Sequence, residues 1–159
     1  MTYEQVLNKI CNYCGQAERA PQDVQQKLTA WEVEEGDIER IMEYLRKERF
    51  LDEQRFVHAF VNDKFTYERW GRIKISYALR QKGFKGAIVQ NTMEDVIDDD
   101  QYLETLASLI AGKMRGMSLP LEQKDRAKLY RFAAQRGFET DLIGEAIRLN
   151  CKQAQDDDF

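Results

Sequence analysis

The chain has 159 residues, of which 43% are hydrophobic and 33% are charged, and its formal net charge is −4. No stretch approaches the roughly 20 consecutive apolar residues of a membrane-spanning helix, which argues against an integral membrane protein. The opening MTYEQVLNKI has an amphipathic pattern rather than a basic region followed by an apolar core, so we expect no export signal and a cytoplasmic location.

The apolar residues recur at spacings of three and four along the whole chain, which predicts helices and no strands. The first three helices are expected to bury Val6, Leu7, Ile10, Cys11 and Cys14, then Val24 and Leu28, then Ile38, Ile41, Met42 and Leu45. The next three are expected to bury Phe56, Phe60, Val61 and Phe65, then Ile75, Ala78 and Leu79, then Ile88, Val89, Met93 and Val96. The last three are expected to bury Leu103, Leu106, Ala107, Ile110 and Met114, then Leu129, Phe132 and Ala133, then Leu142, Ile143, Ala146 and Ile147.

Residues with special backbone preferences mark several helix ends. Pro21 and Pro120 are expected to open the second and eighth helices, because the first turn does not need the missing N–H. Asp52 is a favourable N-cap for the fourth helix. Gly71 interrupts the chain before the fifth helix, and Gly83 lies where a left-handed C-cap belongs.

The helices repeat at a second level. Segment Ala78–Met93 resembles Phe132–Ile147, with Gly83 aligned on Gly137, and the first part of the chain is a more divergent copy. Repeats of about 50 residues are typical of stacked helical units. We therefore predict an all-α protein of three tandem three-helix repeats in an elongated, curved array, with repeats at 1–52, 53–98 and 99–159. A compact nine-helix bundle is the alternative.

The three cysteines do not form a disulfide framework, because their number is odd. Cys11 and Cys14 form a CxxC pair, which admits a zinc or redox interpretation. A structural zinc site needs a second pair of ligands, and the single histidine, His58, is distant in sequence. We therefore expect Cys11 to continue the apolar stripe of the first helix.

Charge is distributed unevenly, which bears on partners rather than on fold. Basic residues dominate 64–86 and 113–136, an acidic belt lies between them at 94–104, and the chain ends in an acidic tail. The sequence has no phosphate-binding glycine loop, no Ser/His/Asp set and no other catalytic motif. These features favour a binding protein without a cofactor over an enzyme.

Two strings of the middle repeat carry a family resemblance. They are F-L-D-E-x-R-F at Phe50–Phe56 and G-x-x-x-I-x-x-x-L-x-x-K-G-F at Gly71–Phe84, and together they resemble the RecX family, regulators of the bacterial recombinase RecA. Members often have a basic, serine-containing second helix in the first repeat. Here that region is PQDVQQKL with Lys27 as its only cation, so no contact role is carried onto the first repeat.

The resemblance implies a negative modulator that binds the groove of the RecA–DNA filament and limits strand exchange, ATP hydrolysis and co-protease activity. Its expected partners are the RecA filament and single- and double-stranded DNA, bound nonspecifically and in a salt-sensitive way. We expect a monomer that does not associate with membranes. The alternative is a helical protein–protein adaptor without affinity for nucleic acid, in keeping with the net negative charge.

The fifth helix is the most informative about contacts. With Ile75 and Leu79 inward, Ile73, Lys74, Tyr77, Arg80 and Gln81 are expected on the opposite side, either as an interface or packed against a neighbouring repeat. Lys82 has a second interpretation, as a cation that stabilises the last helical turn. The phenylalanines, Trp31 and Trp70 are expected to pack, with the tryptophans at the junctions between repeats. The expected filament or DNA contacts are Lys64, Arg69, Arg72, Lys74, Tyr77, Arg80, Lys82, Lys85, Lys124, Arg126, Lys128 and Arg131.

Overall fold

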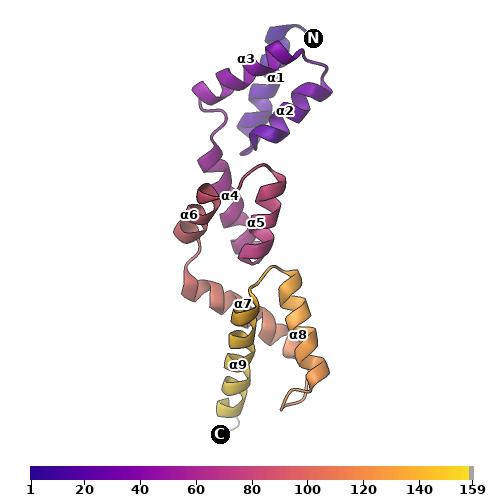
Figure 1. Cartoon of the computed structure of the whole chain (residues 1–159), viewed down its shortest axis with the longest axis vertical. Coiled ribbons are helices and arrows are strands. Elements are labelled where there is room, and N and C mark those ends of the chain that lie inside the picture. Colours follow the sequence, from indigo (N-terminus) through magenta and orange to yellow (C-terminus); the bar gives the residue numbers. More distant parts are fainter. Residues whose placement is uncertain (158–159) are drawn as a thin grey trace.

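The computed structural model describes residues 1–157, which form nine helices and no strand. The helices are α1 (Tyr3–Gln16), α2 (Pro21–Ala30), α3 (Glu35–Lys47), α4 (Glu53–Thr66), α5 (Arg72–Gln81), α6 (Ala87–Val96), α7 (Asp99–Met114), α8 (Gln123–Gln135) and α9 (Thr140–Asp157). They form three triplets, α1–α3, α4–α6 and α7–α9, that follow one another along the long axis of the molecule (Figure 1). The predicted all-α, elongated array of three-helix units is confirmed. The expected acidic tail is helical through Asp157, and Asp158 lies outside the described residues.

Local sequence explains most helix ends. Thr2 and Gln5 form a reciprocal capping box at α1, Pro21 occupies the first turn of α2, and the Asp52 side chain accepts from the N–H of Arg55. One expected helix start is wrong. Glu122 is the N-cap of α8, which begins at Gln123, so Pro120 lies in the preceding loop and not in the first turn.

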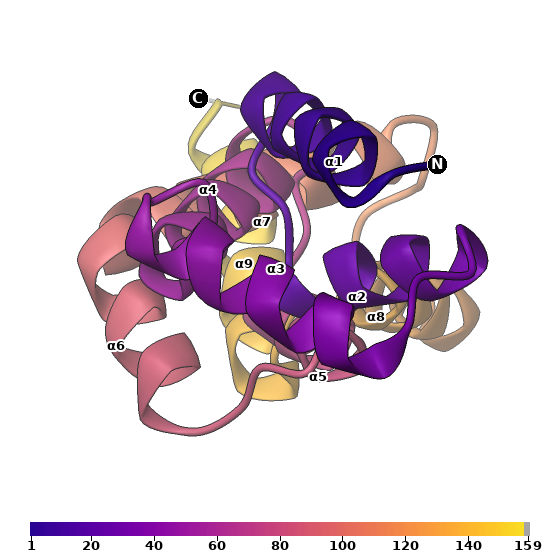
Figure 2. The ribbon, with the colours of Figure 1, turned by 90° about the horizontal axis from the view of Figure 1, so that it is seen from above.

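In each of the most extensively packed pairs of helices, both helices belong to the same triplet. Seen along the long axis, the second helices of the triplets, α2, α5 and α8, project onto the same side of the molecule (Figure 2). Hydrogen bonds along this side join the C-terminal end of α8 to the N-terminal end of α5, and the C-terminal end of α5 to the N-terminal end of α2. The three second helices therefore stack end to end in one column.

The apolar core is divided into two clusters rather than three. The first triplet has its own cluster, which includes Ile10, Leu28 and Leu45. The second and third triplets share a continuous cluster that runs from Phe56 to Ile147 and also takes in Ala20. The division into repeats at 52/53 and 98/99 remains a prediction about which segments fold as units.

The junction between the second and third triplets is made by backbone. The N–H groups of Gly71 and Ile73 donate to the carbonyl oxygens of Arg136 (2.7 Å) and Gly137 (3.0 Å). These donors at the start of α5 have no partner within their own helix, and the end of α8 supplies acceptors for them. A side chain would not fit here, since a Cβ on Gly71 would lie 2.3 Å from the Gly137 carbonyl oxygen.

The junction between the first and second triplets is made by side chains instead. The Gln22 amide donates to the Gln81 carbonyl oxygen (3.1 Å), Lys82 pairs with Asp23 (2.9 Å), and Arg55 pairs with Glu18. These groups are partly exposed. The first triplet is therefore joined to the rest by polar contacts at its surface and by Ala20, which is buried in the shared apolar cluster.

Several expected core residues need correction. Tyr102, which the apolar pattern missed, is only 1% exposed, whereas Phe60 and Phe132 are half-buried. Trp70 packs on the core shared by the second and third triplets, but Trp31 packs on the first cluster and not at a junction. Among residues 1–157, no helix is long and apolar enough to cross a membrane.

Candidate protein and nucleic-acid interface

The outward side of α5 carries large apolar residues beside a cation. Ile73 is 56% exposed and Tyr77 is 66% exposed, while Ile75 and Leu79 on the inward side are fully buried. Ile73 and Tyr77 line a shallow pocket of about 360 Å³, together with Arg72, Ser76 and Arg80. Isoleucine, tyrosine and arginine at spacings of four and three form one ridge, which we call the α5 ridge (Ile73, Tyr77, Arg80). Exposed aromatic and arginine side chains of this kind are enriched at protein interfaces.

Four expected contact cations of the second triplet are already engaged within the molecule. Arg72 pairs with Glu139 (3.0 Å) and Asp99 (2.6 Å), and Lys82 pairs with Asp23. Lys64 and Lys74 lie over the Trp70 ring, at 4.7 and 4.4 Å from its centroid. These contacts give the four side chains structural roles, whatever else they bind.

Lys74 is also not where the helical pattern put it. It was expected on the outward side with Tyr77, but it is half-buried between the Trp70 ring and the turn at Gly137. The reason is that Lys74 lies about 100° from Ile75 around the helix, on the flank of α5, where the third triplet packs. Ile73, Tyr77, Arg80 and Gln81 are exposed as expected.

Tyr102 organises the polar part of the same junction. Its hydroxyl accepts from the N–H of Arg72 (3.0 Å) and donates to the Glu139 carboxylate, while the Arg72 guanidinium lies 3.9 Å from its ring centroid. Burial, followed by the hydrogen bond to Glu139, raises the pKa of Tyr102 well above its usual range. Tyr102, Leu106 and Ile110 follow one another at intervals of four, a signal that could have identified the buried tyrosine.

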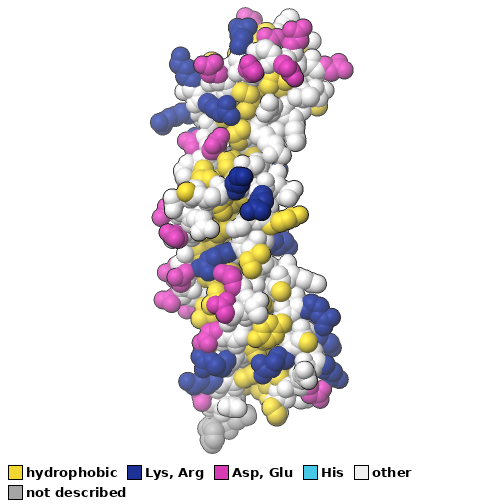
Figure 3. Space-filling model, viewed as in Figure 1, with side chains coloured by type: hydrophobic (Ala, Val, Ile, Leu, Met, Phe, Trp, Pro, Cys, Tyr) yellow, Lys and Arg dark blue, Asp and Glu magenta, His cyan; other side chains and the backbone are white. Residues whose placement is uncertain are grey.

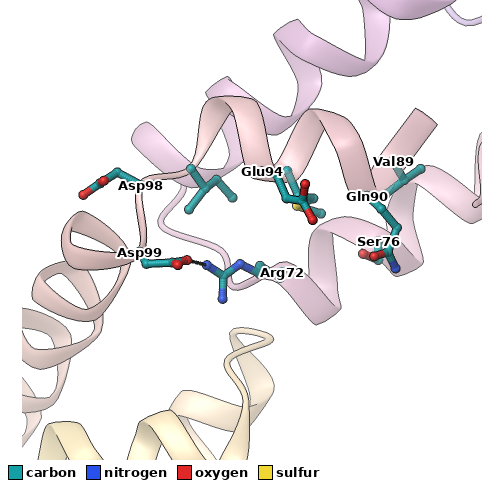
Figure 4. Close-up of a pocket in the computed structure, with 9 residues that line it drawn as sticks. Arg72, Ser76, Val89, Gln90, Glu94, Asp98 and Asp99 are labelled. Atoms are coloured by element: carbon teal, nitrogen blue, oxygen red, sulfur yellow. Dashed lines mark hydrogen bonds and ion pairs between the residues drawn. The ribbon is translucent and has the colours of Figure 1, made fainter. Parts of the chain in front are cut away.

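A pocket of about 520 Å³ lies beside this junction, between α5, α6 and the start of α7. Figure 4 shows Arg72 reaching across to Asp99, with Glu94, Gln90 and Ser76 around the same space. Asp98 caps α7 by accepting from the N–H of Gln101 (2.9 Å). The aspartates of the acidic belt that line this pocket therefore have local structural roles, in a helix cap and an ion pair.

The second basic group lies on α8. Lys124, Arg126, Lys128 and Arg131 are all exposed, and of these only Lys124 has an ion pair among the described residues, to Glu122 at 3.5 Å. Figure 3 shows basic side chains over α5 and over α8 in the same view of the molecule. Arg69 and Lys85, at either end of α5, are exposed as well. The structure thus places Arg80 of the first basic region and the four α8 cations of the second on one column of helices.

The cysteine pair belongs to the first core. Cys14 is buried in that cluster and Cys11 packs against it. Burial raises the pKa of the Cys14 thiol to about 11, with the neighbouring Cys11 adding to the effect, so the neutral thiol is favoured. Among the described residues, no group of three or more His, Cys, Asp and Glu side chains is arranged to hold a metal ion.

Comparison with protein families gives two matches. Residues 52–93 match the second three-helix domain of RecX, and residues 99–147 match the third three-helix domain of RecX. The matched segments contain most of α4–α6 and most of α7–α9, which are the parts that share one core.

Proteins named "Regulatory protein RecX" are similar over most of the chain. The relative from Clostridium acetobutylicum is 22% identical over 151 residues, covering 92% of this chain and 69% of its own length. The relative from Herbaspirillum seropedicae is 28% identical over 140 residues, covering 88% of this chain and 87% of its own length. The chain spans 47% of a relative from Oceanobacillus iheyensis, at 27% identity over 130 residues.

Solved structures have the same fold. The crystal structure of RecX from Lactobacillus salivarius matches with a TM-score of 0.83 at 19% identity, covering 93% of this chain and 96% of that one. A crystal structure of regulatory protein RecX matches with a TM-score of 0.79 at 17% identity, covering 92% of this chain and 71% of that one. With two successive RecX domains matched over more than half its residues, the chain belongs to the RecX family.

Proposed function

We propose that this protein is a negative modulator of RecA that binds the RecA–DNA filament and limits strand exchange, ATP hydrolysis and co-protease activity. It acts in the cytoplasm as a binding protein, without a catalytic step or a cofactor of its own. The observation that carries the proposal is the match of α4–α6 and α7–α9 to successive RecX domains. RecX relatives are named as regulatory proteins.

The surface chemistry supports the same proposal. The α5 ridge offers apolar, aromatic and cationic groups on a rigid helix, which suits a protein partner. The exposed cations of α8 suit a phosphate-bearing partner. An elongated stack with both surfaces along one column fits a filament that presents protein and nucleic acid along its length.

A helical adaptor without nucleic-acid affinity is the second candidate. Two observations favour it: the net charge of −4, and the use of Arg72, Lys82, Lys64 and Lys74 in contacts within the molecule. A salt titration of single-stranded DNA binding, with and without RecA, separates the two candidates. Phosphate contacts make the affinity fall steeply with salt, whereas an adaptor shows no binding to DNA alone.

The direct test is ATP hydrolysis by RecA on single-stranded DNA, with this protein titrated in. Under the proposal, hydrolysis falls with increasing protein and reaches a plateau once the filament sites are filled. Unchanged hydrolysis across the titration, together with no loss of strand exchange, would contradict the proposal.

A further inference from the structure

Helix α8 has two chemically distinct sides. Leu129 and Ala133 are buried in the shared core. Lys124, Lys128 and Arg131 are exposed and follow one another at intervals of four and three residues, so they lie along one line on the side away from the core. We call these three residues the α8 cation row. Arg126 is not in it, because two residues correspond to about 200° of helix turn.

The charge of this row is largely uncompensated. Lys124 and Glu122 are 3.5 Å apart with side chains that are 74% and 62% exposed, and a pair this open contributes little. Lys128 and Arg131 form no ion pair with any described residue. Lys113 of α7 adds a further cation on the flank, where its Nζ lies 5.3 Å from the Phe132 ring centroid. The half-buried Asp125 is the one acidic residue within α8 itself.

The row also lacks what makes the α5 ridge suitable for a protein. The large apolar residues that are exposed on α5 have no counterpart on α8 among the described residues. Protein interfaces draw most of their energy from aromatic and arginine anchors that become buried, and in this row only Arg131 is of that kind, with no exposed aromatic residue beside it on α8. Neutralising phosphates needs only accessible cations, and the released counterions supply the free energy.

We propose that the α8 cation row binds the phosphate backbone of single-stranded DNA, without sequence preference and without RecA. Each of the three cations can neutralise one phosphate of the strand, so the row accounts for about three phosphate contacts. The inference deepens the proposed function by assigning the nucleic-acid contact to α8, and its test omits RecA so that the two can fail separately.

The test is a salt titration of binding to a labelled oligothymidine by the whole chain. The variant is Lys124→Gln with Lys128→Gln and Arg131→Gln, which removes charge and keeps residues that favour helix. Each phosphate contact contributes about 0.7 to the slope of log affinity against log salt for single strands, so the slope should become shallower by about 2. When the salt concentration rises fourfold, the wild type should therefore lose about twentyfold more affinity than the variant loses.

The matched control is Lys9→Gln with Arg46→Gln and Lys47→Gln, three exposed cations of the first triplet. It changes the net charge by the same amount and should leave the slope as in the wild type. The charge-preserving variant Lys124→Arg with Lys128→Arg should also keep the slope, and unchanged helical circular dichroism verifies that each variant is folded.

Three results would overturn the inference: no binding of oligothymidine by the wild type, an unchanged slope in the α8 variant, or an equal drop in the control. If the α8 variant keeps its slope but no longer inhibits RecA, the row contacts protein instead. If the wild type binds DNA through α8 but has no effect on RecA hydrolysis, the proposed function fails and this inference stands.

Discussion

Two glycines from different triplets, Gly71 and Gly137, meet where α5 begins and α8 ends. Gly137 has φ of 94°, and a Cβ on it would lie 2.3 Å from the Lys74 Cβ. Gly83 occupies the matching place at the end of α5 with φ of 93°, but a Cβ there would meet only the end of the Gln22 side chain, at 3.1 Å. The predicted positive φ at both repeat-related glycines is confirmed. The close approach of Gly71 to Gly137 depends on residues far apart in sequence and was not predicted.

We expect Gly137→Ala to destabilise the protein more than Gly83→Ala. Both variants place a Cβ in a left-handed conformation, which costs about 1–2 kcal/mol. Only Gly137→Ala also forces α5 and α8 apart, which adds about 1–3 kcal/mol as in overpacked cores. Urea unfolding of the two variants measures the difference. Equal losses of unfolding free energy in the two variants would show that the junction between α5 and α8 accommodates the added Cβ without cost.

At the scale of single helices, α5 has three sides with different tasks. Ile75 and Leu79 fill the core, Lys74 packs on its flank against Trp70, and the α5 ridge faces outward. The helical period predicted the inward and outward residues, because these depend only on spacing. It could not predict the flank, because packing there requires the third triplet.

The α5 ridge should be sensitive to Tyr77→Ala combined with Arg80→Glu. Both side chains are exposed and remote from the core, so the fold should persist with a change in stability of about 0.5 kcal/mol. Removing an aromatic anchor and reversing a charge should weaken binding to the RecA filament by about a hundredfold, or nearly 3 kcal/mol. Inhibition of RecA ATP hydrolysis at a concentration that saturates with wild type measures the effect.

The matched control is Arg40→Glu with Arg46→Glu on α3, where the surrounding surface is already acidic. It should reduce inhibition much less. Equal losses from both pairs would indicate a general charge effect, and full inhibition by the α5 variant would place the contact elsewhere. Lys74→Glu is unsuitable as a surface reversal, because it would also disturb the packing on Trp70.

At the scale of the whole molecule, three repeats are held by two cores. The first triplet has a separate apolar cluster and meets the second through polar side chains and the buried Ala20. The second and third triplets share apolar packing, in which the Tyr102 ring lies 5.8 Å from Phe65 and 5.1 Å from Phe138 between ring centroids. Polar contacts at an exposed surface contribute little, so cooperativity should be weaker between the first and second triplets than between the second and third.

We therefore expect urea to unfold the protein in two transitions. The chain has two tryptophans, and Trp31 packs on the first core while Trp70 packs on the shared core. The fluorescence of a Trp70→Phe background thus reports the first core alone, and that of a Trp31→Phe background reports the shared core alone. Leu28→Ala should lower the free energy of unfolding only for the transition seen by Trp31, and Leu106→Ala only for the transition seen by Trp70. Each loss should be about 2–5 kcal/mol. Coincident transitions that shift together in both backgrounds would contradict the division.

The sequence by itself determined the nine helices, most of their inward residues, the glycine C-caps and the family. These features depend on neighbours within about one turn of helix, or on motifs within one repeat. Only the tertiary structure decided that Tyr102 is buried, that Arg72 and Lys82 have ion-pair partners, and that the second and third triplets share a core. Arg72 and Glu139 are 67 residues apart, and Lys82 and Asp23 are 59 apart. No local pattern connects residues so distant, because their contact depends on how the triplets stack.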